Sequence, residues 1–314
     1  QISLVDNRLL LTLGLRYDKY DLKPEVDGMS QQALTAMNRQ ATEQSYSETS
    51  PKLGAIWKFD DVYSVYGQIA TGFRAPNYNE VNGAFRNPAQ LYAITPNPDL
   101  KPETSVGGEI GFRAVTAKAR GQIAVYDNRY TDFIENLVLR CPGDPRCVRV
   151  GGVNYVTYMN QNLSNVRIYG AEVRGSWDFA PNWRVDGAIA YANGEDTDRH
   201  QPLNSIEPMK GTFGLTYDTG RWGSEARIRA AAAKKDVDET NGIWFKPPGY
   251  AVADISGWLK LTSQSRIVVA VNNLFDQKYY LWGDIRQADA TNPVAVDFYS
   301  QPGRNVRVAL QADF

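Results

Sequence analysis

The stretch Arg8-Leu9-Leu10-Leu11-Thr12-Leu13-Gly14-Leu15-Arg16-Tyr17-Asp18 decides the fold class, because apolar and polar side chains alternate along it. Every second residue from Leu9 to Tyr17 is apolar, and Thr12 and Arg16 stand among the residues between. A period of two is typical of a β-strand with one apolar and one polar face. The stretch therefore predicts a strand, and an all-β fold wherever the pattern repeats.

The same alternation returns along the whole chain, for example from Gly211 to Tyr217 and from Val306 to Phe314. Helical periodicity is absent, and we assign the Ala-rich stretch 230–233 to the end of a strand. The pattern predicts about twelve strands. Their expected beginnings lie near residues 8, 51, 62, 104, 119, 166, 183, 209, 222, 249, 266 and 304.

The connections between these strands alternate between short and long. The short ones are 60–61, 115–118, 180–182, 218–221 and 262–265, and the long ones are 19–50, 74–103, 130–165, 193–208, 232–248 and 276–302. Outer-membrane barrels show this alternation, because short turns face the periplasm and long loops face outside. A soluble sandwich has no reason to place every long loop at one end. We therefore predict a transmembrane antiparallel β-barrel in a bacterial outer membrane, surrounded by membrane lipid.

Aromatic residues beside the short turns favour the barrel over a soluble sandwich, because an aromatic girdle marks the membrane–water interface of a barrel. The clustered residues are Trp57, Phe59, Tyr63, Trp177, Phe179, Trp183, Tyr217 and Trp222. Charged residues on the opposite face of the strands are expected to line the lumen and to pair with one another. They are Glu109, Arg113, Glu172, Arg174, Arg184, Asp186, Glu225, Arg227 and Arg229.

Length and charge limit the classes of function. The 314 residues carry 34 basic and 35 acidic side chains, so no net charge steers the chain toward nucleic acid, and no nucleic-acid partner is expected. No apolar window approaches the roughly 18 residues of a membrane helix, whereas about ten residues suffice for a barrel strand. The chain begins at Gln1 without a recognisable signal peptide, and we expect a processed or incomplete chain.

The two cysteines, Cys141 and Cys147, are separated by Pro-Gly-Asp-Pro-Arg. Pro and Gly favour a tight turn that brings two sulfur atoms together, so the spacing predicts a local disulfide. A disulfide implies an oxidising compartment. A pair of free thiols is the alternative, and a metal site is disfavoured because no His lies nearby.

Three motifs follow one another along the chain. Gly72-Phe73-Arg74-Ala75-Pro76 follows the third expected strand, and Asn97-Pro98-Asp99-Leu100-Lys101-Pro102-Glu103-Thr104 precedes the fourth. Val271-Asn272-Asn273-Leu274-Phe275-Asp276-Gln277-Lys278-Tyr279-Tyr280 stands near the end. With these motifs the chain resembles the TonB-dependent outer-membrane receptors, and among them the haem and haemoprotein receptors. The resemblance covers essentially the whole chain, including the loop order.

That resemblance implies a barrel of about 22 strands around an amino-terminal plug. Residues 1–314 would form the carboxy-terminal part of that one barrel domain, and the twelve strands would be the second half of the barrel. The plug and the TonB box, which the TonB complex of the inner membrane engages, would lie outside this sequence. The implied activity is transport rather than catalysis, so the chain is not expected to be an enzyme.

In the haem receptors that this chain resembles, a His between the first two motifs ligates the haem iron. This sequence departs from that pattern, because its only His is His200 in another loop. A Tyr phenolate is a hard anionic donor that also ligates ferric haem. Tyr92 is the expected axial ligand and Tyr78 the second choice, with Phe85 packed on the porphyrin face and Arg86 paired with a propionate. Haem, free or in a haemoprotein, is thus expected as the transported ligand and not as a catalytic cofactor.

Other functions stay open from the sequence. Similar motifs occur more loosely in ferric-siderophore receptors, where they fix loop geometry, with Arg74 facing the lumen. An outer-membrane hydrolase would need a nucleophile and a base, which one His and no recognisable Ser context do not offer. A porin has no need of the three motifs. His200 and the run from Lys234 to Glu239 are expected to be solvated loop residues.

Overall fold

A computed structural model describes residues 2–240, 242–286 and 288–312 of the chain. The last expected strand is therefore seen as far as Ala312, and Phe314 lies outside the described residues. Over these ranges the structure contains no helix long and apolar enough to cross a membrane.

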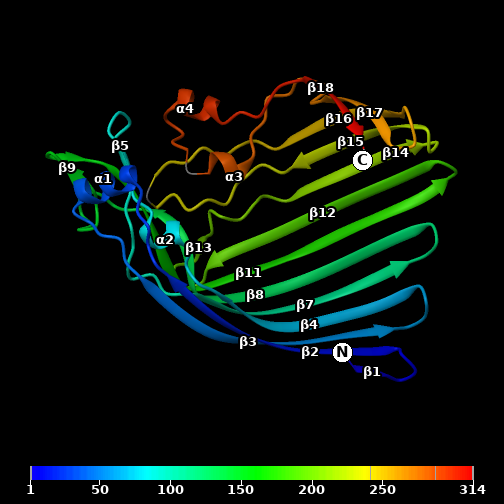
Figure 1. The fold of residues 1–314 in the computed structure, drawn as a ribbon, viewed down its shortest axis with the longest axis horizontal. Helices are drawn as coiled ribbons and strands as arrows, with labels where there is room; N and C mark the ends of the chain where they lie inside the picture. The colour runs from blue at the N-terminus through cyan, green and yellow to red at the C-terminus, as the bar shows by residue number, and fades with distance from the viewer. Residues whose placement is uncertain (1, 241, 287, 313–314) are drawn as a thin grey trace.

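Sixteen of the eighteen strands in the described residues form one sheet, and the other two, at 149–150 and 153–154, pair with each other. Strands that follow one another along it pair antiparallel, and Figure 1 shows them side by side in chain order. The path runs through β1 (Ile2–Leu4), β2 (Leu9–Leu22), β3 (Gln44–Lys58), β4 (Tyr63–Arg74), β7 (Glu103–Val115), β8 (Ala119–Val138), β11 (Val156–Ala180), β12 (Trp183–Asp196), β14 (Lys210–Asp218), β15 (Trp222–Ala231), β16 (Tyr250–Lys260), β17 (Ser265–Asn272) and β18 (Asn305–Ala312).

The remaining elements lie in the long connections, which gather at one end of the sheet (Figure 1). The strands among them are β5 (Phe85–Asn87), β6 (Tyr92–Ile94), β9 (Arg149–Val150), β10 (Val153–Asn154) and β13 (Gln201–Pro202). The helices are α1 (Gly28–Met37), α2 (Tyr78–Asn82), α3 (Trp282–Ile285) and α4 (Pro293–Phe298).

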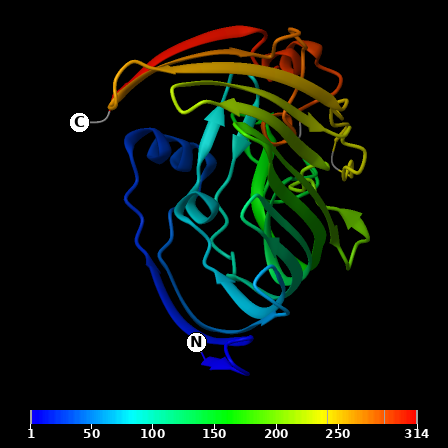
Figure 2. The same cartoon turned by 90° about the vertical axis from the view of Figure 1, so that its right-hand side faces the viewer.

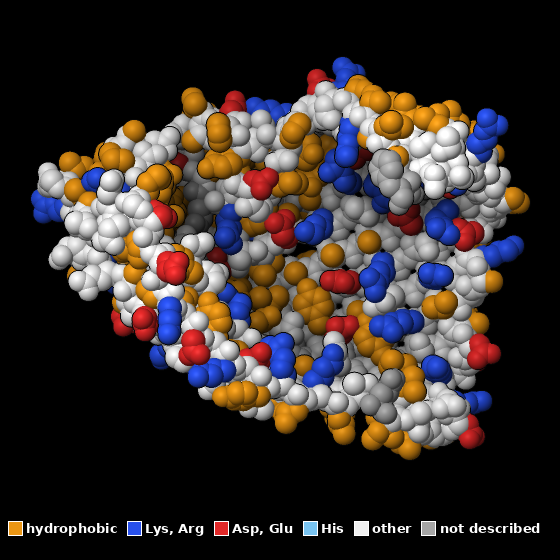
Figure 3. Space-filling model, viewed as in Figure 1, with side chains coloured by type: hydrophobic (Ala, Val, Ile, Leu, Met, Phe, Trp, Pro, Cys, Tyr) orange, Lys and Arg blue, Asp and Glu red, His pale blue; other side chains and the backbone are white. Residues whose placement is uncertain are grey.

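The sheet curves into a trough (Figure 2). The trough is open over the described residues, because β1 and β18 stand at the two ends of the strand order. Basic and acidic side chains gather over the hollowed face in Figure 3. Leucines on the opposite face of β2 are exposed, Leu15 by 76%. An apolar outer face and a charged inner face are the two faces of an outer-membrane barrel wall. The prediction of an antiparallel barrel wall with twelve principal strands, β2 to β18 along the path, is confirmed within the described residues.

The aromatic girdle forms a continuous chain of ring contacts beside the short turns. Trp177, Phe179, Trp183, Tyr217 and Trp222 follow one another with ring centroids 5.8, 6.2, 4.8 and 5.3 Å apart. Trp177 is 55% exposed on the outer wall. Amphipathic rings concentrate at a membrane–water interface, so this belt marks the level at which the wall leaves the bilayer on the short-turn side.

Charged residues of the inner face pair across strands, as the alternation predicts. Arg227 of β15 lies 3.1 Å from Asp186 of β12 and 2.5 Å from Glu225. Arg229 pairs with Asp254 of β16 at 2.9 Å. Cross-strand pairs of opposite charge stabilise a sheet. Part of the charge on the lumenal face is therefore neutralised by ion pairs within the wall.

Two strands run much farther than expected, and the predicted loop 130–165 is wrong. β8 continues to Val138 and β11 begins at Val156, so that residues 139–155 form the connection. Asp132 has a positive φ of 56°, but the register of β8 and β11 stays constant from Trp177 with Ala119 to Tyr158 with Val138. Asn160, Gln161 and Asn162 are polar at three successive positions of β11, so the alternation of apolar and polar residues is lost there and the strand is hidden from a sequence reading.

The expectation of no helices is also wrong in the first long connection, where α1 forms. The side chain of Asp27 accepts a hydrogen bond from Ser30 N, and Asn38 ends the helix in the left-handed conformation. Asp at the N-cap and Asn at the C-terminal end are the residues that helix termini prefer. The helix has 10 residues, too few for a clear 3.6-residue period against the strand pattern.

Lys234 is not the solvated residue that its charge run predicted. It is buried, its Nζ donates to Ile206 O at 2.8 Å, and it lies 5.1 Å from the ring centre of Trp282. Burial, above all, lowers the pKa of Lys234. The prediction holds for His200, whose side chain is 83% exposed.

Cys141 and Cys147 form the predicted disulfide, with Cα atoms 5.8 Å apart. The bridge closes the tip of the 139–155 connection. Within this tip Arg146 pairs with Asp144 at 2.6 Å. The free-thiol alternative is thereby excluded.

Candidate functional site

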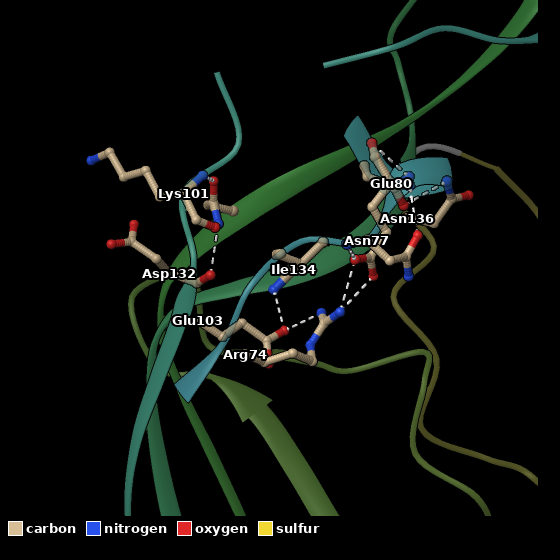
Figure 4. A network of polar contacts seen from close by, with 10 residues as sticks. Arg74, Asn77, Glu80, Lys101, Glu103, Asp132, Ile134 and Asn136 are labelled. Atoms are coloured by element: carbon tan, nitrogen blue, oxygen red, sulfur yellow. Dashed lines mark hydrogen bonds and ion pairs between the residues drawn. The ribbon is translucent and has the colours of Figure 1, made fainter. Parts of the chain in front are cut away.

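The first motif ends β4 in an ion-pair network that spans two strands and a helix. Arg74 Nη1 donates to both carboxylate oxygens of Glu80 at 2.8 Å, and Arg74 Nη2 donates to Glu103 Oε2 at 2.6 Å (Figure 4). The same oxygen of Glu103 accepts from Ile134 N at 2.8 Å. Glu103 is buried, and a buried carboxylate needs such partners. Arg74 therefore connects the start of the 75–102 loop with its end.

Glu80 has a second partner, which fixes α2. Its side chain accepts from Asn77 N at 2.8 Å, while Asn77 Oδ1 accepts from Glu80 N at 3.0 Å. These reciprocal bonds are a capping box. Pro76, the last residue of the first motif, is fully buried just before this helix. One carboxylate thus holds both the helix start and Arg74.

The second motif docks the return of the loop onto β11. Asn97 is buried, its Nδ2 donates to Asn160 O at 2.7 Å, and its Oδ1 accepts from Asp99 N at 3.1 Å. Leu100, also buried, packs with Val81 and Ile134. Two backbone carbonyls of the motif also accept bonds from β3: Pro98 O from Gln44 Nε2 and Leu100 O from Tyr46 Oη. In this structure the two motifs position the loop.

Between the motifs the loop forms a hairpin, β5 and β6, which adds to the end of β11. Tyr92 of β6 pairs in parallel with Val156. Its ring centre lies 5.6 Å from that of Phe85 and 6.4 Å from that of Tyr158. Figure 2 shows the hairpin within the cross-section of the trough. The hairpin therefore carries its aromatic side chains at the mouth of the barrel.

The four expected haem contacts separate into two groups. Tyr92 and Phe85 are in ring contact, and Arg86 stands beside Phe85 in β5, with its guanidinium carbon 5.9 Å from the ring centre of Tyr155. Tyr78 lies in α2 instead, and its hydroxyl donates to Glu25 O at 3.3 Å. Among the described residues the Tyr92 hydroxyl makes no hydrogen bond. Of the two tyrosines, Tyr92 is thus the one with an unengaged oxygen.

Tyr158 belongs to the same aromatic cluster and was missed from the sequence. Burial raises the pKa of its phenol most, followed by Tyr299, Tyr92 and Asp289. Tyr299 follows α4 and is in ring contact with Phe298, which is 86% exposed. The hairpin and the start of β11 thus bring three aromatic side chains into ring contact, which we call the mouth cluster: Phe85, Tyr92 and Tyr158. Tyr158 fell inside the wrongly predicted 130–165 loop, so its strand environment was not visible.

A second set of contacts joins other loops above the wall. Ser205 donates to Glu135 Oε2 at 2.7 Å, and Arg286 lies 3.4 Å from Glu135 Oε1. Trp282 Nε1 donates to Asn204 O at 2.8 Å. Glu135 is buried in the part of β8 beyond Asp132, outside the membrane-spanning part, and burial raises its pKa most. We call these residues with Lys234 the loop tie: Glu135, Asn204, Ser205, Lys234, Trp282 and Arg286.

His, Cys, Asp and Glu side chains form no group of three or more that would hold a metal ion in the described ranges. The donors offered at the mouth are instead phenol oxygens, which are hard oxygen ligands for ferric iron. An aromatic cluster around a phenol suits a flat, largely apolar ligand that carries its own metal.

Comparison with known protein families gives a match over most of the chain. Residues 1–274 match the family model described as TonB dependent receptor-like, beta-barrel. A hemoglobin-haptoglobin utilization protein B of Neisseria meningitidis (serogroup A / serotype 4A) is 25% identical over 98% of this chain and 42% of its own length. A probable hemoglobin and hemoglobin-haptoglobin-binding protein 3 of Haemophilus influenzae is 23% identical over 86% and 31%.

The chain therefore spans less than half the length of these relatives. Among solved structures, the copper transporter OprC has a TM-score of 0.74 at 23% identity, over 98% of this chain and 45% of the other. The FrpB iron transporter from Neisseria meningitidis (F5-1 variant) has a TM-score of 0.68 at 17% identity, over 98% and 44%. At these identities the structures establish the fold.

Proposed function

The chain belongs to the TonB-dependent receptor family, as part of its outer-membrane β-barrel, and from this premise we propose that the complete protein imports haem iron. The proposal covers haem as cargo, a haemoprotein as its source and the TonB complex of the inner membrane as the energy-coupling partner. The observation that carries it is the mouth cluster, in which Tyr92 presents an unengaged phenol between Phe85 and Tyr158.

Each residue of the hairpin has a role in this proposal. Tyr92 ligates the ferric iron through its phenolate, which iron favours as a hard anionic donor. Phe85 packs on one face of the porphyrin, and the guanidinium of Arg86 pairs with a propionate in a charge-assisted hydrogen bond. The two sequence motifs hold the hairpin in place through Arg74 and Asn97. The chain binds and passes on its ligand, and no chemical conversion of haem is proposed.

The names of the relatives support haem over a siderophore. Both proteins compared here are named for binding or utilising hemoglobin and hemoglobin-haptoglobin. Those names describe the relatives, of which this chain covers less than half, so the transfer to this protein is a proposal. The likeness to transporters of copper and iron rests on identities of 23% and 17% and concerns the fold.

Growth on a single iron source tests the function. The gene for the complete receptor would be deleted from its host, and growth would be measured with haem, hemoglobin or a ferric siderophore as sole iron source. We expect loss of growth on haem and hemoglobin, restored by the wild-type gene, with siderophore growth unchanged. Loss of growth on the siderophore alone would contradict the proposal.

A further inference from the structure

The hairpin of β5 and β6 has two faces, because successive residues of a strand point to opposite sides. Tyr92 and Ile94 lie on one face, together with Phe85, which pairs directly with Ile94. Ala93 stands between them in the strand and lies on the other face, where it is completely buried. The residues that cover Ala93 therefore hold the hairpin from the side opposite to Tyr92.

Two other long connections supply this cover. One is the first connection, which contains α1, and the other is the connection that the disulfide closes. Figure 1 shows α1, β5 and β9 together at the long-loop end, where α1 contacts both strands. Buried apolar side chains from the three segments form one cluster, and removal of such surface from water stabilises the contact. We call this cluster the hairpin support: Ala33, Met37, Ala93, Val148 and Tyr155.

Hydrogen bonds to the buried Thr157 fix the disulfide connection at the hairpin support. Val148 N donates to Thr157 Oγ1 at 2.9 Å, and Thr157 Oγ1 donates to Tyr155 O at 3.0 Å. Thr157 is also the residue of β11 that pairs with Ala93. Val148 directly follows Cys147, the second cysteine of the bridge. The disulfide therefore restrains the segment that reaches the hairpin.

The first connection is bonded to the motif loop on both sides of α1. After the helix, Thr42 N donates to Asn82 Oδ1 at 2.7 Å, and Asn82 Nδ2 donates to Thr42 O at 3.0 Å. Before the helix, Glu25 O accepts from the Tyr78 hydroxyl at 3.3 Å. Asn82 is buried, so these bonds satisfy an amide that water does not reach. They keep α1 beside the hairpin.

We propose, on the basis of the proposed role of Tyr92 as iron ligand, that the hairpin support holds Tyr92 in place for haem. Met37 and Val148 are then positioning residues, and the disulfide of Cys141 and Cys147 is part of the same support. β5 and β6 have only 3 residues each, and a two-stranded hairpin alone is marginally stable. When a binding conformation is populated for part of the time, the apparent affinity falls by that fraction.

Four variants of the complete receptor test this role. The double variant Cys141→Ser with Cys147→Ser removes the bridge, and Met37→Ala opens a cavity in the hairpin support. Met37→Leu nearly conserves the volume and should behave like wild type. Arg146→Ala is the matched control in the disulfide connection, because it removes an ion pair with Asp144 and no residue of the hairpin support.

Amide hydrogen exchange without ligand measures how firmly the hairpin is held. We expect exchange at residues 85–94 to accelerate about 30-fold in Met37→Ala. The bridge has a sequence separation of 6, and loss of so short a ring should accelerate exchange by up to about 50-fold. Met37→Leu, Arg146→Ala and residues 210–218 of every variant should keep wild-type rates. A wild-type rate at 85–94 in Met37→Ala or in the double serine variant overturns the proposal.

Haem titration of the same variants separates positioning from ligation. The double serine variant and Met37→Ala should bind haem more weakly, with the absorption maxima of the wild-type complex, because Tyr92 keeps its phenol oxygen. Met37→Leu should restore the wild-type affinity. Unchanged affinity in the two weakened variants, or shifted maxima, overturns the proposal. Absence of haem binding by the wild type would overturn the proposed function instead, and the exchange rates would still show whether the support holds the hairpin.

Discussion

The guanidinium of Arg74 lies 2.6 Å from the buried carboxylate of Glu103, and this contact joins the end of β4 to the start of β7. The 28 residues between these two positions (75 to 102) leave the wall and return to it through one ion-pair network. The network includes the capping box of α2. The loop that carries the proposed ligand-binding hairpin is thus anchored at its base on the sheet. A site is positioned more precisely when rigid strands support it.

Removal of Arg74 should loosen this loop. Arg74→Ala leaves Glu103 buried without its cation, which costs about 2–3 kcal/mol in a partly buried pair. Proteolytic cleavage within residues 75–102 should then accelerate about 30-fold, as expected for 2 kcal/mol of local opening. The measurement is the cleavage rate of the complete receptor in detergent, mapped by mass spectrometry.

Arg184→Ala is the matched control for Arg74. Arg184 pairs with Asp178 at 2.6 Å, but both side chains are exposed beside a short turn. An exposed pair contributes about 0–1 kcal/mol, so cleavage in the loop should stay at the wild-type rate. Equal acceleration in both variants would contradict the role given to the Arg74 network.

We expect Asn97 to hold the second motif in place through its side-chain hydrogen bonds. Asn97→Ala removes the donor to Asn160 O and the acceptor for Asp99 N from a buried position. Leaving such groups unsatisfied costs about 1–3 kcal/mol. We expect faster amide hydrogen exchange at residues 95–102 and unchanged exchange in β14 and β15. Unchanged exchange at 95–102 would show that the second motif does not hold the loop.

Docking of the last long loop should weaken as pH rises. The folded pKa of Glu135 is raised by burial above its ordinary value of 4.5, so the folded state holds the proton to higher pH than the open state. Stability is therefore fully present below pH 4.5 and is lost as pH rises through the raised pKa. Exchange at residues 280–286, corrected for the intrinsic rate, should be slower at pH 5 than at pH 7.5.

Glu135→Gln tests the cause of this pH dependence. The amide keeps the size of the side chain and the acceptor for Ser205, but it does not ionise. The variant should show equal protection of residues 280–286 at both pH values. A variant that keeps the wild-type pH dependence would place its origin in another group.

The strands and turns of this wall follow from the sequence, because membrane-facing positions impose a period of two. The alternation from Leu9 to Tyr17 and the belt from Trp177 to Trp222 need no tertiary information. The upper parts of β8 and β11 require such information, because polar residues such as Asn160, Gln161 and Asn162 follow one another there and no period of two remains. The strand pattern therefore fades at the level where the bilayer ends.

The mouth cluster was partly predictable. Tyr92 and Phe85 stand between the first two motifs, and the hairpin brings their rings together. Tyr158 comes from the start of β11, and no spacing in the sequence links it to residue 92. Lys234 illustrates the same limit, since its burial depends on Ile206 O and the ring of Trp282. Loop-to-loop contacts set these environments, and local sequence does not encode them.

A haem titration of the purified complete receptor, followed by visible absorption, tests the central claim most directly. Wild type, Tyr92→Phe and the matched Tyr78→Phe would be compared, since each variant loses one phenol oxygen and keeps its ring. We expect a saturable one-to-one spectrum of Tyr-ligated ferric haem in wild type and Tyr78→Phe, and its loss in Tyr92→Phe. No saturable change in the wild type, or an unchanged spectrum in Tyr92→Phe, would contradict the account.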